Sequence, residues 1–322
     1  MAKNPSVAIL TATYNQEQYI RECIDSVLAQ TYPYWHLFIL NDGSTDATSQ
    51  IAHEYAARDS RITVMDFEHE GMLTLAKRYN TALTQSTDDF VAILDGDDFW
   101  PPNKLQIQVG AHSKSDVALS FGNVLEIAEP HKTEMFSADT RTFLKCADPY
   151  TTLIPYLESR FSVLPVSTLL RRNALDRIGG FQQPSYLPLC DYPTWLLLGT
   201  KGMMYIDNIL GYWRHNPNQT TWVQARQTAY GMFKYEREFV EQQQLPVDLF
   251  SKSRTRYLAD ASYRSAVLSW KSGNTQEAYE ALKELFMFRR FQNIDMLFKF
   301  FLVVAWNTLR STQHSASSER QS

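Results

Sequence analysis

The sequence predicts an α/β fold with a mostly parallel central sheet, helices on both faces, and a C-terminal region made only of helices. Two patterns lead to this prediction. Short apolar segments alternate with helical periodicity as far as residue 110, and only helical periodicity remains after residue 224. With 322 residues, 44% hydrophobic and 20% charged, the composition is that of a globular protein with one large or two moderate domains. The net charge of −4 argues against nucleic acid as a partner, because it offers no basic surface.

The first half of the chain repeats the order strand, then helix. We expect the first strand at 7–15 and its helix at 17–30, where isoleucine and valine recur at helical spacing. A second strand ends at Leu40, and its helix begins after Asp46. The third strand, third helix and fourth strand are expected at 62–68, 73–86 and 89–95. Repeated units of this kind predict parallel strands joined by crossover helices.

Polar segments stand at the ends of all four predicted strands. They are "TATYN", "NDGSTD", "EHEG", which contains His69, and "DGDD". In parallel α/β sheets, ligands bind beyond the carboxyl ends of the strands. We therefore expect these segments to form a binding site at one edge of the sheet.

The segment "DGDD" places Asp95, Asp97 and Asp98 within four positions of one another. Like charges this close raise each other's pKa, so the arrangement is unfavourable unless a cation lies beside it. Mg²⁺ typically takes one or two carboxylates together with substrate phosphates. The segment therefore indicates a metal site held by Asp95 and Asp97. A solvated acidic turn is the alternative, since Asp-Gly pairs also mark turns.

A further carboxylate stands at the end of the second strand. Asp42 follows an apolar run, where it can accept hydrogen bonds from a ribose or a base edge, and Gly43 permits the turn. The segment "STDAT" that follows is also typical of a helix N-cap. Capping does not account for Asp42, because Asp42 precedes the turn.

Four segments, taken in order, resemble the nucleotide-sugar domain of the family 2 glycosyltransferases. They are "ILTATYNQEQYIRECIDSVLAQTY", "LNDGSTDAT", "HEGMLTLAKRYNTAL" and "FVAILDGDDFWPPNKLQIQV", between Ser6 and Val109. The resemblance implies the GT-A fold, which is Rossmann-like. It also implies donor-site roles: Thr11, Thr13, Tyr14 and Asn15 line the nucleotide pocket, Asp42 contacts the nucleoside, Arg78 lies near the diphosphate, Asp95 and Asp97 form the metal-binding D-x-D motif at the donor, and Asp98 is structural.

A later part of the chain resembles the segment that carries the catalytic base in this family. "SVLPVSTLLRRNALDRIGGFQQ" (162–183) matches the acceptor side, and "LPLCDYPTWLLLGTKG" (187–202) implies that Asp191 is the general base. Cys190 stands where the family commonly has Glu, which leaves the role of that first acid open. From the residues alone, Asp191 is also typical of a helix N-cap before a proline. Trp195 is either a stacking surface for a sugar or, as is commoner for aromatic residues at helical spacing, a core residue.

The segment "GYWRHNPNQTT" (211–221) resembles the closing segment of the same family. The resemblance implies that His215 lies close to the metal and the diphosphate. His215 would then be a third metal ligand or a hydrogen-bond donor to phosphate.

Together these features predict an inverting, metal-dependent glycosyltransferase. A carboxylate base removes the acceptor proton, while Mg²⁺ or Mn²⁺ stabilises the departing diphosphate, so a single displacement inverts the sugar carbon. The expected donor is a UDP-sugar, and the expected acceptor is a cell-envelope glycan or a lipid-linked molecule. Two alternatives stay open: a non-catalytic domain that binds nucleotide or glycan in an assembly, and a nucleotidyltransferase. The latter usually has a phosphate loop rich in Gly, Arg and Lys, which "TATYNQEQ" lacks.

Three parts are expected along the chain. They are a GT-A domain at 1–224, with a donor half at 6–110 and an acceptor half at 111–224, a helical region at 225–310, and a disordered tail at 311–322.

The segment 294–310 is densely apolar, but Lys299 interrupts it, and a spanning helix needs about 20 apolar residues. We expect this segment to be buried against the catalytic domain, to form a homo-oligomer, or to dock on a membrane surface. Three dispersed cysteines and an N-terminus without a signal peptide predict a cytoplasmic protein. Peripheral contact with the inner face of the membrane stays open.

Overall fold

A computed structural model of the chain describes residues 4–128, 130–215, 225–245, 262–263, 265–267, 269–270 and 274–288. The chain divides into two compact units, Met1–Gln219 and Thr220–Ser322. The predicted domain boundary at residue 224, the segment 294–310 and the tail 311–322 lie outside the described residues.

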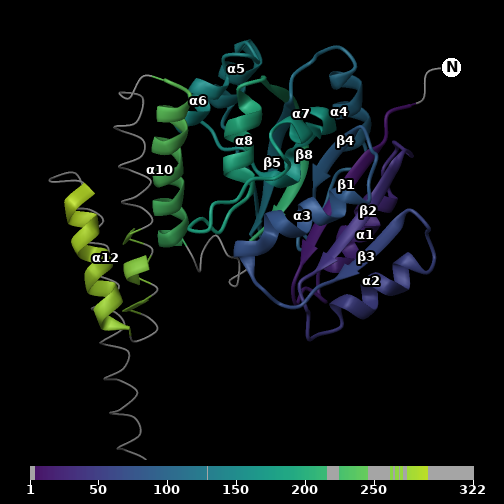
Figure 1. The fold of residues 1–322 in the computed structure, drawn as a ribbon, viewed down its shortest axis with the longest axis horizontal. Helices are drawn as coiled ribbons and strands as arrows, with labels where there is room; N and C mark the ends of the chain where they lie inside the picture. Colours follow the sequence, from purple (N-terminus) through teal and green to yellow (C-terminus); the bar gives the residue numbers. More distant parts are fainter. Residues whose placement is uncertain are drawn as a thin grey trace, which may run out of the picture. The chain divides into compact units, whose positions relative to one another are not determined.

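The first unit is built around one eight-stranded sheet with the order β3-β2-β1-β4-β7-β5-β6, in which β8 also pairs with β5 (Figure 1). The strands are β1 (Val7–Thr13), β2 (Trp35–Asn41), β3 (Ile62–Asp66), β4 (Phe90–Ile93), β5 (Leu119–Ala128), β6 (His131–Glu134), β7 (Leu169–Arg171) and β8 (Met203–Arg214). The first four strands are parallel, and β8 is parallel to β5. The short β7 pairs antiparallel with both β4 and β5 and thereby joins the two halves of the sheet.

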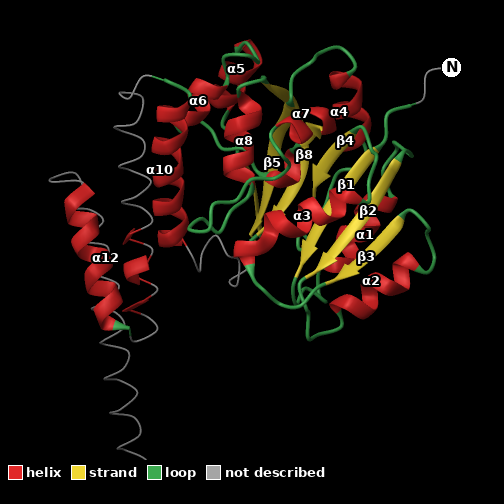
Figure 2. Ribbon diagram, in the orientation of Figure 1, coloured by secondary structure: helices red, strands yellow, loops and turns green. Residues whose placement is uncertain are grey.

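Helices surround this sheet (Figure 2). They are α1 (Ile20–Leu28), α2 (Thr48–Ala56), the 3₁₀ helix η1 (Met72–Thr74), α3 (Leu75–Thr84), α4 (Lys104–His112), α5 (Ala138–Cys146), α6 (Leu153–Leu157), the 3₁₀ helix η2 (Pro165–Ser167), α7 (Arg172–Arg177) and α8 (Asp191–Gly199). The prediction of a mostly parallel sheet with surrounding helices is confirmed.

The strand β1 is apolar along its length because both of its faces are covered. Val7 and Ile9 belong to the same core cluster as Ile20 of α1. Ala8 and Leu10, which alternate with them and point to the other face, are completely buried too. Such double coverage is typical of parallel sheets and explains the run of apolar residues that predicted the strand.

The register of the parallel strands brings their carboxyl ends level with one another. Thr13, the last residue of β1, pairs with Asn41, the last residue of β2, and Asn41 pairs with Asp66 at the end of β3. The loops that leave these strands therefore begin side by side. This alignment places the polar segments identified in the sequence at one edge of the sheet.

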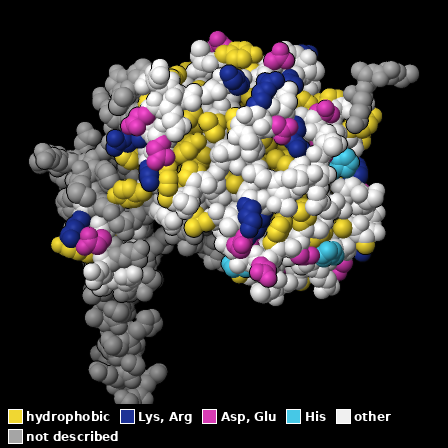
Figure 3. All heavy atoms as spheres, in the orientation of Figure 1, with side chains coloured by type: hydrophobic (Ala, Val, Ile, Leu, Met, Phe, Trp, Pro, Cys, Tyr) yellow, Lys and Arg dark blue, Asp and Glu magenta, His cyan; other side chains and the backbone are white. Residues whose placement is uncertain are grey.

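Charged side chains of both signs are scattered over the visible face of the first unit (Figure 3). On this face the described Lys and Arg residues alternate with Asp and Glu residues and form no large area of one sign.

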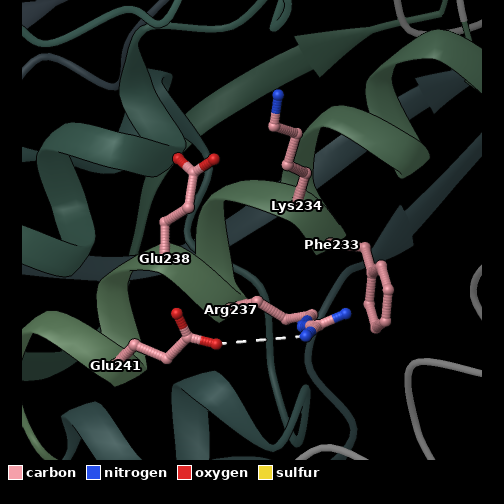
Figure 4. A pocket seen from close by; sticks show the side chains of 5 residues that line it. All are labelled: Phe233, Lys234, Arg237, Glu238 and Glu241. Carbon is pink, nitrogen blue, oxygen red and sulfur yellow. Dashed lines mark ion pairs between the residues drawn. The ribbon is translucent and has the colours of Figure 1, made fainter.

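The second unit contains the helices α10 (Ala225–Gln242) and α12 (Thr275–Phe288). Ala266 and Ala281 form a small buried cluster with partly buried hydrophobic neighbours, so the chain before α12 packs against it. None of the helices in the described part of the chain is long and apolar enough to span a membrane. A shallow pocket on α10 is lined by Phe233, Lys234, Arg237, Glu238 and Glu241 (Figure 4). Its charged residues are of both signs, with Arg237 and Glu241 3.9 Å apart.

Candidate active site

The loops that follow β2 and β3 lie against each other. Gly43 follows β2 with a φ of +65°, and a Cβ atom at this position would lie 2.8 Å from the backbone nitrogen of His69. Both the positive φ and this close approach require glycine. Asp42, the residue before the turn, is therefore held beside the loop that carries His69.

Asp42 is the centre of a buried polar cluster. Nη2 of Arg78 lies 2.5 Å from Oδ1 of Asp42, and the backbone N–H of Glu70 donates to the same oxygen at 3.1 Å. Arg78 is 4% exposed and Asp42 is 8% exposed, so the pair is shielded from bulk water. The cluster combines a hydrogen-bond acceptor with adjacent donors in a small space, which is the kind of pairing that recognises the edge of a nucleobase.

Two aromatic rings stack beside Asp42. The rings of Tyr14 and His69 are 4.1 Å apart between centroids, with 19° between their planes. Nδ1 of His69 lies 3.1 Å from Oδ2 of Asp42 and 3.1 Å from the backbone oxygen of Asp42. Tyr14 is 42% exposed, so this stacked pair is open to solvent.

Three consecutive residues of α3 connect this cluster to two other parts of the site. Arg78 contacts Asp42, as described above, and the hydroxyl of Tyr79 donates to Oδ1 of Asp95 at 3.4 Å. The amide of Asn80 donates to the backbone oxygen of Phe181 at 3.0 Å and accepts from its backbone N–H at 2.8 Å. α3 therefore links the loop after β2, the acidic loop after β4, and the segment that leads to α8.

The acidic loop after β4 carries Asp95, Asp97 and Asp98 in a crowded setting. Asp97 is 6% exposed and Asp98 3%, whereas Asp95 stays partly accessible. Burial, followed by the negative charges of Asp97 and then Asp191, raises the pKa of Asp95 to about 7. Burial and the same kind of repulsion raise the pKa of Asp98 well above its ordinary value. The unfavourable crowding predicted from "DGDD" is therefore a property of the folded protein.

Gly96 lets this loop approach β1. A Cβ atom on Gly96 would lie 2.4 Å from Oε1 of Gln16 and 2.8 Å from Oγ1 of Thr13, so only glycine fits without a shift of these side chains. Asp98 is fixed differently: one of its carboxylate oxygens accepts from the backbone N–H of Arg214 at 2.9 Å. This contact agrees with the structural role expected for Asp98.

Asp95 and Asp97 fit a hard divalent cation. Their donor atoms are carboxylate oxygens, and the repulsion between them is the kind that a bound cation relieves. In the described part of the chain, no group of three or more His, Cys, Asp and Glu side chains is arranged to hold a metal ion. A cation here would therefore need further oxygen ligands from a substrate, as Mg²⁺ commonly takes from phosphates.

Asp191 is the first residue of α8, and Cys190 occupies the N-cap position without a side-chain cap hydrogen bond. The alternative interpretation of Asp191 as the N-cap residue is therefore wrong. Burial raises the pKa of Asp191 to about 7, and the side chain stays partly accessible. Tyr79, whose hydroxyl contacts Asp95, packs its ring on Phe181 at 5.0 Å between centroids, so the segments that carry Asp95 and Asp191 are adjacent. Cys190 is 2% exposed and occupies the place of the expected Glu as a buried thiol.

His215 directly follows β8. Nε2 of His215 lies 3.4 Å from Glu126, and its ring packs on Trp213 with centroids 4.3 Å apart. In the described part of the chain, Asp95, Asp97 and His215 form no group of three arranged to hold a metal ion, and a role of His215 at the metal or the diphosphate stays a prediction. Trp195 is 0% exposed and donates from Nε1 to the backbone oxygen of Val163 at 3.3 Å. Trp195 is therefore a core residue rather than a sugar-stacking surface.

The residues at the end of β1 differ in what they offer a ligand. Thr11 is 0% exposed, so its side chain presents no surface to a nucleotide in this structure. Thr13 donates from Oγ1 to Gln16 at 2.8 Å, and Oδ1 of Asn15 accepts from the backbone N–H of Thr45 at 2.8 Å. Thr13 and Asn15 shape the loops, and Tyr14 and Asn15 are the exposed members of the group.

Sequence reasoning missed the contacts of Tyr79 and Arg214 and noted only the place of His69 at a strand end. The helical spacing of α3 gives Tyr79 a buried face, but nothing in the pattern indicates that its hydroxyl reaches Asp95. Arg78 was expected near the diphosphate, yet its guanidinium pairs with Asp42, the residue expected at the nucleoside.

The protein is thus an α/β protein that gathers polar and acidic groups at the carboxyl edge of its sheet. The sequence profile of Glycosyl transferase family 2 matches residues 8–179, which is more than half of the chain. The chain belongs to glycosyl transferase family 2 and is a glycosyltransferase, as its resemblance to that family predicted.

Two relatives show how the similarity is distributed. The chain is 29% identical over 198 residues to the putative teichuronic acid biosynthesis glycosyltransferase TuaG of Bacillus subtilis, covering 62% of this chain and 73% of that protein. It is 38% identical over 117 residues to the UDP-Glc:alpha-D-GlcNAc-diphosphoundecaprenol beta-1,3-glucosyltransferase WfgD of Escherichia coli. That second alignment covers 36% of this chain and 45% of the relative.

Solved structures share the fold. Residues 1–349 of Staphylococcus aureus TarS superpose with a TM-score of 0.57 at 18% identity, covering 88% of this chain and 80% of that structure. The mannosyltransferase PcManGT of Pyrobaculum calidifontis, solved with GDP-Man and Mn²⁺, gives a TM-score of 0.58 at 18% identity, covering 95% of this chain and 88% of that structure. At this identity the likeness shows the fold alone, and it confirms the predicted GT-A fold.

Proposed function

We propose that this enzyme transfers a sugar from a UDP-sugar to a cell-envelope glycan or lipid-linked acceptor, with inversion at the sugar carbon. One observation carries the proposal. Tyr79 of α3 contacts Asp95 after β4 and packs on Phe181 of the segment that leads to Asp191, so two partly accessible carboxylates lie on adjacent segments. In a displacement reaction, one carboxylate can accept the proton of the acceptor, and the other can help to hold a cation beside the leaving diphosphate.

The cluster around Asp42 supports uracil as the base of the donor. Uracil presents an N–H donor beside a carbonyl acceptor, and the cluster presents a carboxylate beside a guanidinium. Cytosine would instead direct a ring nitrogen acceptor at the carboxylate, which is unfavourable without a proton. Thymine presents the same edge as uracil, and guanine also presents N–H donors beside a carbonyl, so the cluster disfavours cytosine alone. The proposal of UDP also draws on the relative named for transfer from UDP-Glc.

The proposed mechanism uses one base. Asp191 accepts the proton of an acceptor hydroxyl, and the hydroxyl oxygen then bonds to the sugar carbon as the bond from that carbon to the diphosphate breaks on the opposite face. A base with a pKa near 7 suits this task, because it is ionised in part at neutral pH and still binds a proton effectively. A divalent cation, Mg²⁺ or Mn²⁺, held by Asp95 and Asp97 would stabilise the charge that develops on the diphosphate.

The acceptor class is supported by the relatives. One is named for teichuronic acid biosynthesis, and another for transfer to a diphosphoundecaprenol-linked sugar. Both are envelope glycans or their lipid-linked precursors, which is the basis for proposing the same broad class here.

Replacement of Asp191 by Asn tests the proposed base. The variant keeps the shape of the side chain but removes its basicity, so UDP release from UDP-sugars in the presence of mixed glycan and lipid-linked acceptors should fall about 10²- to 10⁴-fold. The affinity for UDP, measured by calorimetry with Mn²⁺, should change less than about twofold, because Asp191 is not expected to contact the nucleotide.

Asp176→Asn is the matched control, because Asp176 is a surface residue that pairs with Arg172. Its turnover should equal that of the wild type. Unchanged turnover in Asp191→Asn would remove the base assignment. A wild-type protein that binds UDP but releases none from any sugar donor would favour the non-catalytic alternative.

A further inference from the structure

His69 makes the two kinds of contact that a flat nucleobase makes with a protein. Its ring stacks on Tyr14, and Nδ1 lies 3.1 Å from Oδ2 of Asp42. Uracil has the same capacities, since it offers an aromatic face for stacking and a ring N–H that donates to a carboxylate. In the free protein, the imidazole therefore meets the partners expected for the base of the donor.

A base cannot take these contacts while His69 holds them. A separation of 4.1 Å between the stacked rings of Tyr14 and His69 is close to van der Waals contact and leaves no space for another ring between them. The carboxylate of Asp42 is also engaged on both sides. Oδ1 faces Arg78 and the backbone N–H of Glu70, and Oδ2 faces His69.

The backbone of the loop that carries His69 is held, because the backbone N–H of Glu70 donates to Asp42 and the backbone oxygen of Gly71 accepts from Nη1 of Arg78 at 3.3 Å. Residues 67–71 form no helix or strand, and the side chain of His69 is 49% exposed. Gly71 has a φ of +72°, and a Cβ atom built on it would meet nothing within 4 Å. Displacement therefore needs only a rotation of the half-exposed imidazole about its side-chain bonds, while the loop backbone keeps its contacts.

We propose that His69 is an affinity-determining residue of the donor site, whose imidazole occupies the place of the nucleobase in the free protein and is displaced when the donor binds. This inference rests on the proposed function. Displacement lowers the apparent affinity, because only the fraction of molecules with His69 turned away can accept the base. Removal of His69 therefore strengthens UDP binding, whereas removal of a residue that only contacts the base would weaken it.

Calorimetry with His69→Ala, in the presence of Mn²⁺, tests whether removal of His69 strengthens UDP binding. UDP should bind about fivefold more tightly than to the wild type, which is the effect of removing one competing hydrogen bond and its stacking contact. Inorganic pyrophosphate should bind equally to both proteins, because it has no base to compete with the imidazole. A second variant, His69→Ser, should behave like His69→Ala.

His36→Ala is the matched control. His36 pairs with Asp88 at 2.8 Å, and its side chain is 54% exposed, but it lies at the opposite end of β2 from Asp42. Its affinity for UDP should be unchanged. Melting temperatures of the His69 variants should stay within about 2 °C of the wild type, because this side chain is half-exposed. His36→Ala should melt at a lower temperature, because it leaves the buried carboxylate of Asp88 without this partner.

Two results would overturn the inference alone. Equal or weaker UDP binding in both His69 variants would mean that the base does not displace the imidazole. Tighter binding of pyrophosphate as well as UDP would mean that the effect lies outside the base site. If neither UDP, GDP, dTDP nor CDP binds the wild type or the variants, the proposed function fails and this inference fails with it.

Discussion

The guanidinium of Arg214 donates a hydrogen bond to the backbone oxygen of Asp97 at 2.7 Å. The same side chain pairs with Glu22 of α1 at 2.6 Å, and the backbone N–H of Arg214 donates to Asp98. A single residue at the end of β8 therefore fixes the peptide of Asp97 from 117 positions away in the sequence. Phe99 and Tyr212, which form a β-bridge and stack, reinforce this attachment.

Loss of Arg214 should weaken the metal-dependent part of UDP binding. We expect Arg214→Ala to raise the Kd for UDP about tenfold when Mn²⁺ is present, because hydrogen bonds to a charged group contribute about 1.5–3 kcal/mol and part of the loop order persists. Without Mn²⁺ the Kd should change little, since Asp42 and Arg78 are untouched. Calorimetry with and without the metal measures both values.

Arg172→Ala serves as the control for Arg214→Ala. Arg172 also donates to two backbone oxygens, those of Leu83 and Ser86, but it belongs to α7. Its removal should leave the effect of Mn²⁺ intact. An equal loss of UDP affinity with and without Mn²⁺ in Arg214→Ala would show a general loss of structure instead of a role in positioning Asp97.

Asp95→Asn should stabilise the metal-free protein and abolish its response to Mn²⁺. Burial and repulsion raise the pKa of Asp95 from 3.8 to about 7, so the ionised carboxylate destabilises the folded state at pH 8. A neutral amide removes that cost, and we expect a gain of about 1 kcal/mol, or about 2–4 °C in melting temperature with EDTA present.

Asp207→Asn should change the melting temperature in the opposite direction, so it is the control for Asp95→Asn. Hydrogen bonds from Arg141 and Lys145 lower the pKa of Asp207 to about 2, so its ionised form is favoured by folding. This variant should melt at a lower temperature than the wild type. A destabilised Asp95→Asn protein would show that the acidic loop is not under electrostatic strain.

The buried His112 predicts how stability changes with pH. Burial, followed by the charge of Arg171, lowers the pKa of His112 from 6.5 to about 4. The unfolded chain therefore binds the proton more strongly than the folded protein, and the stability present above pH 6.5 is lost as pH falls toward 4. The full loss corresponds to about 3 kcal/mol.

Urea unfolding at several pH values, for the wild type and His112→Gln, measures this effect. The amide keeps a polar atom near Ser120, which His112 contacts at 3.0 Å, but it does not titrate. The free energy of unfolding of the wild type should fall relative to the variant between pH 6.5 and 4. If the free energies of unfolding of the wild type and of His112→Gln change with pH in parallel, groups other than His112 cause the pH dependence.

The parallel half of the fold and the acidic loop could be predicted from the sequence because the patterns that indicate them each lie within one short segment. The apolar run of β1 and the helical spacing of α1 each lie within one segment, and parallel connectivity then places all strand ends at one edge. Asp42, Asp95 and Asp97 were recognisable because carboxylates directly after apolar strands have few structural explanations.

The remaining features depend on contacts between distant segments. β7 has only three residues, too few for any periodicity, yet it joins the two halves of the sheet. His215 lies one residue beyond β8, and only the pairing of β8 with β5 decides that its ring faces Glu126. In the same way, the pairing of Arg78 with Asp42 follows from how α3 packs on the sheet, which the motif alone does not specify.

Anomalous scattering from crystals grown with UDP and Mn²⁺ tests the central claim most directly. The account predicts one manganese peak bonded to carboxylate oxygens of Asp95 and Asp97 and to oxygens of the UDP diphosphate. Bound UDP with no manganese beside these two aspartates would contradict it.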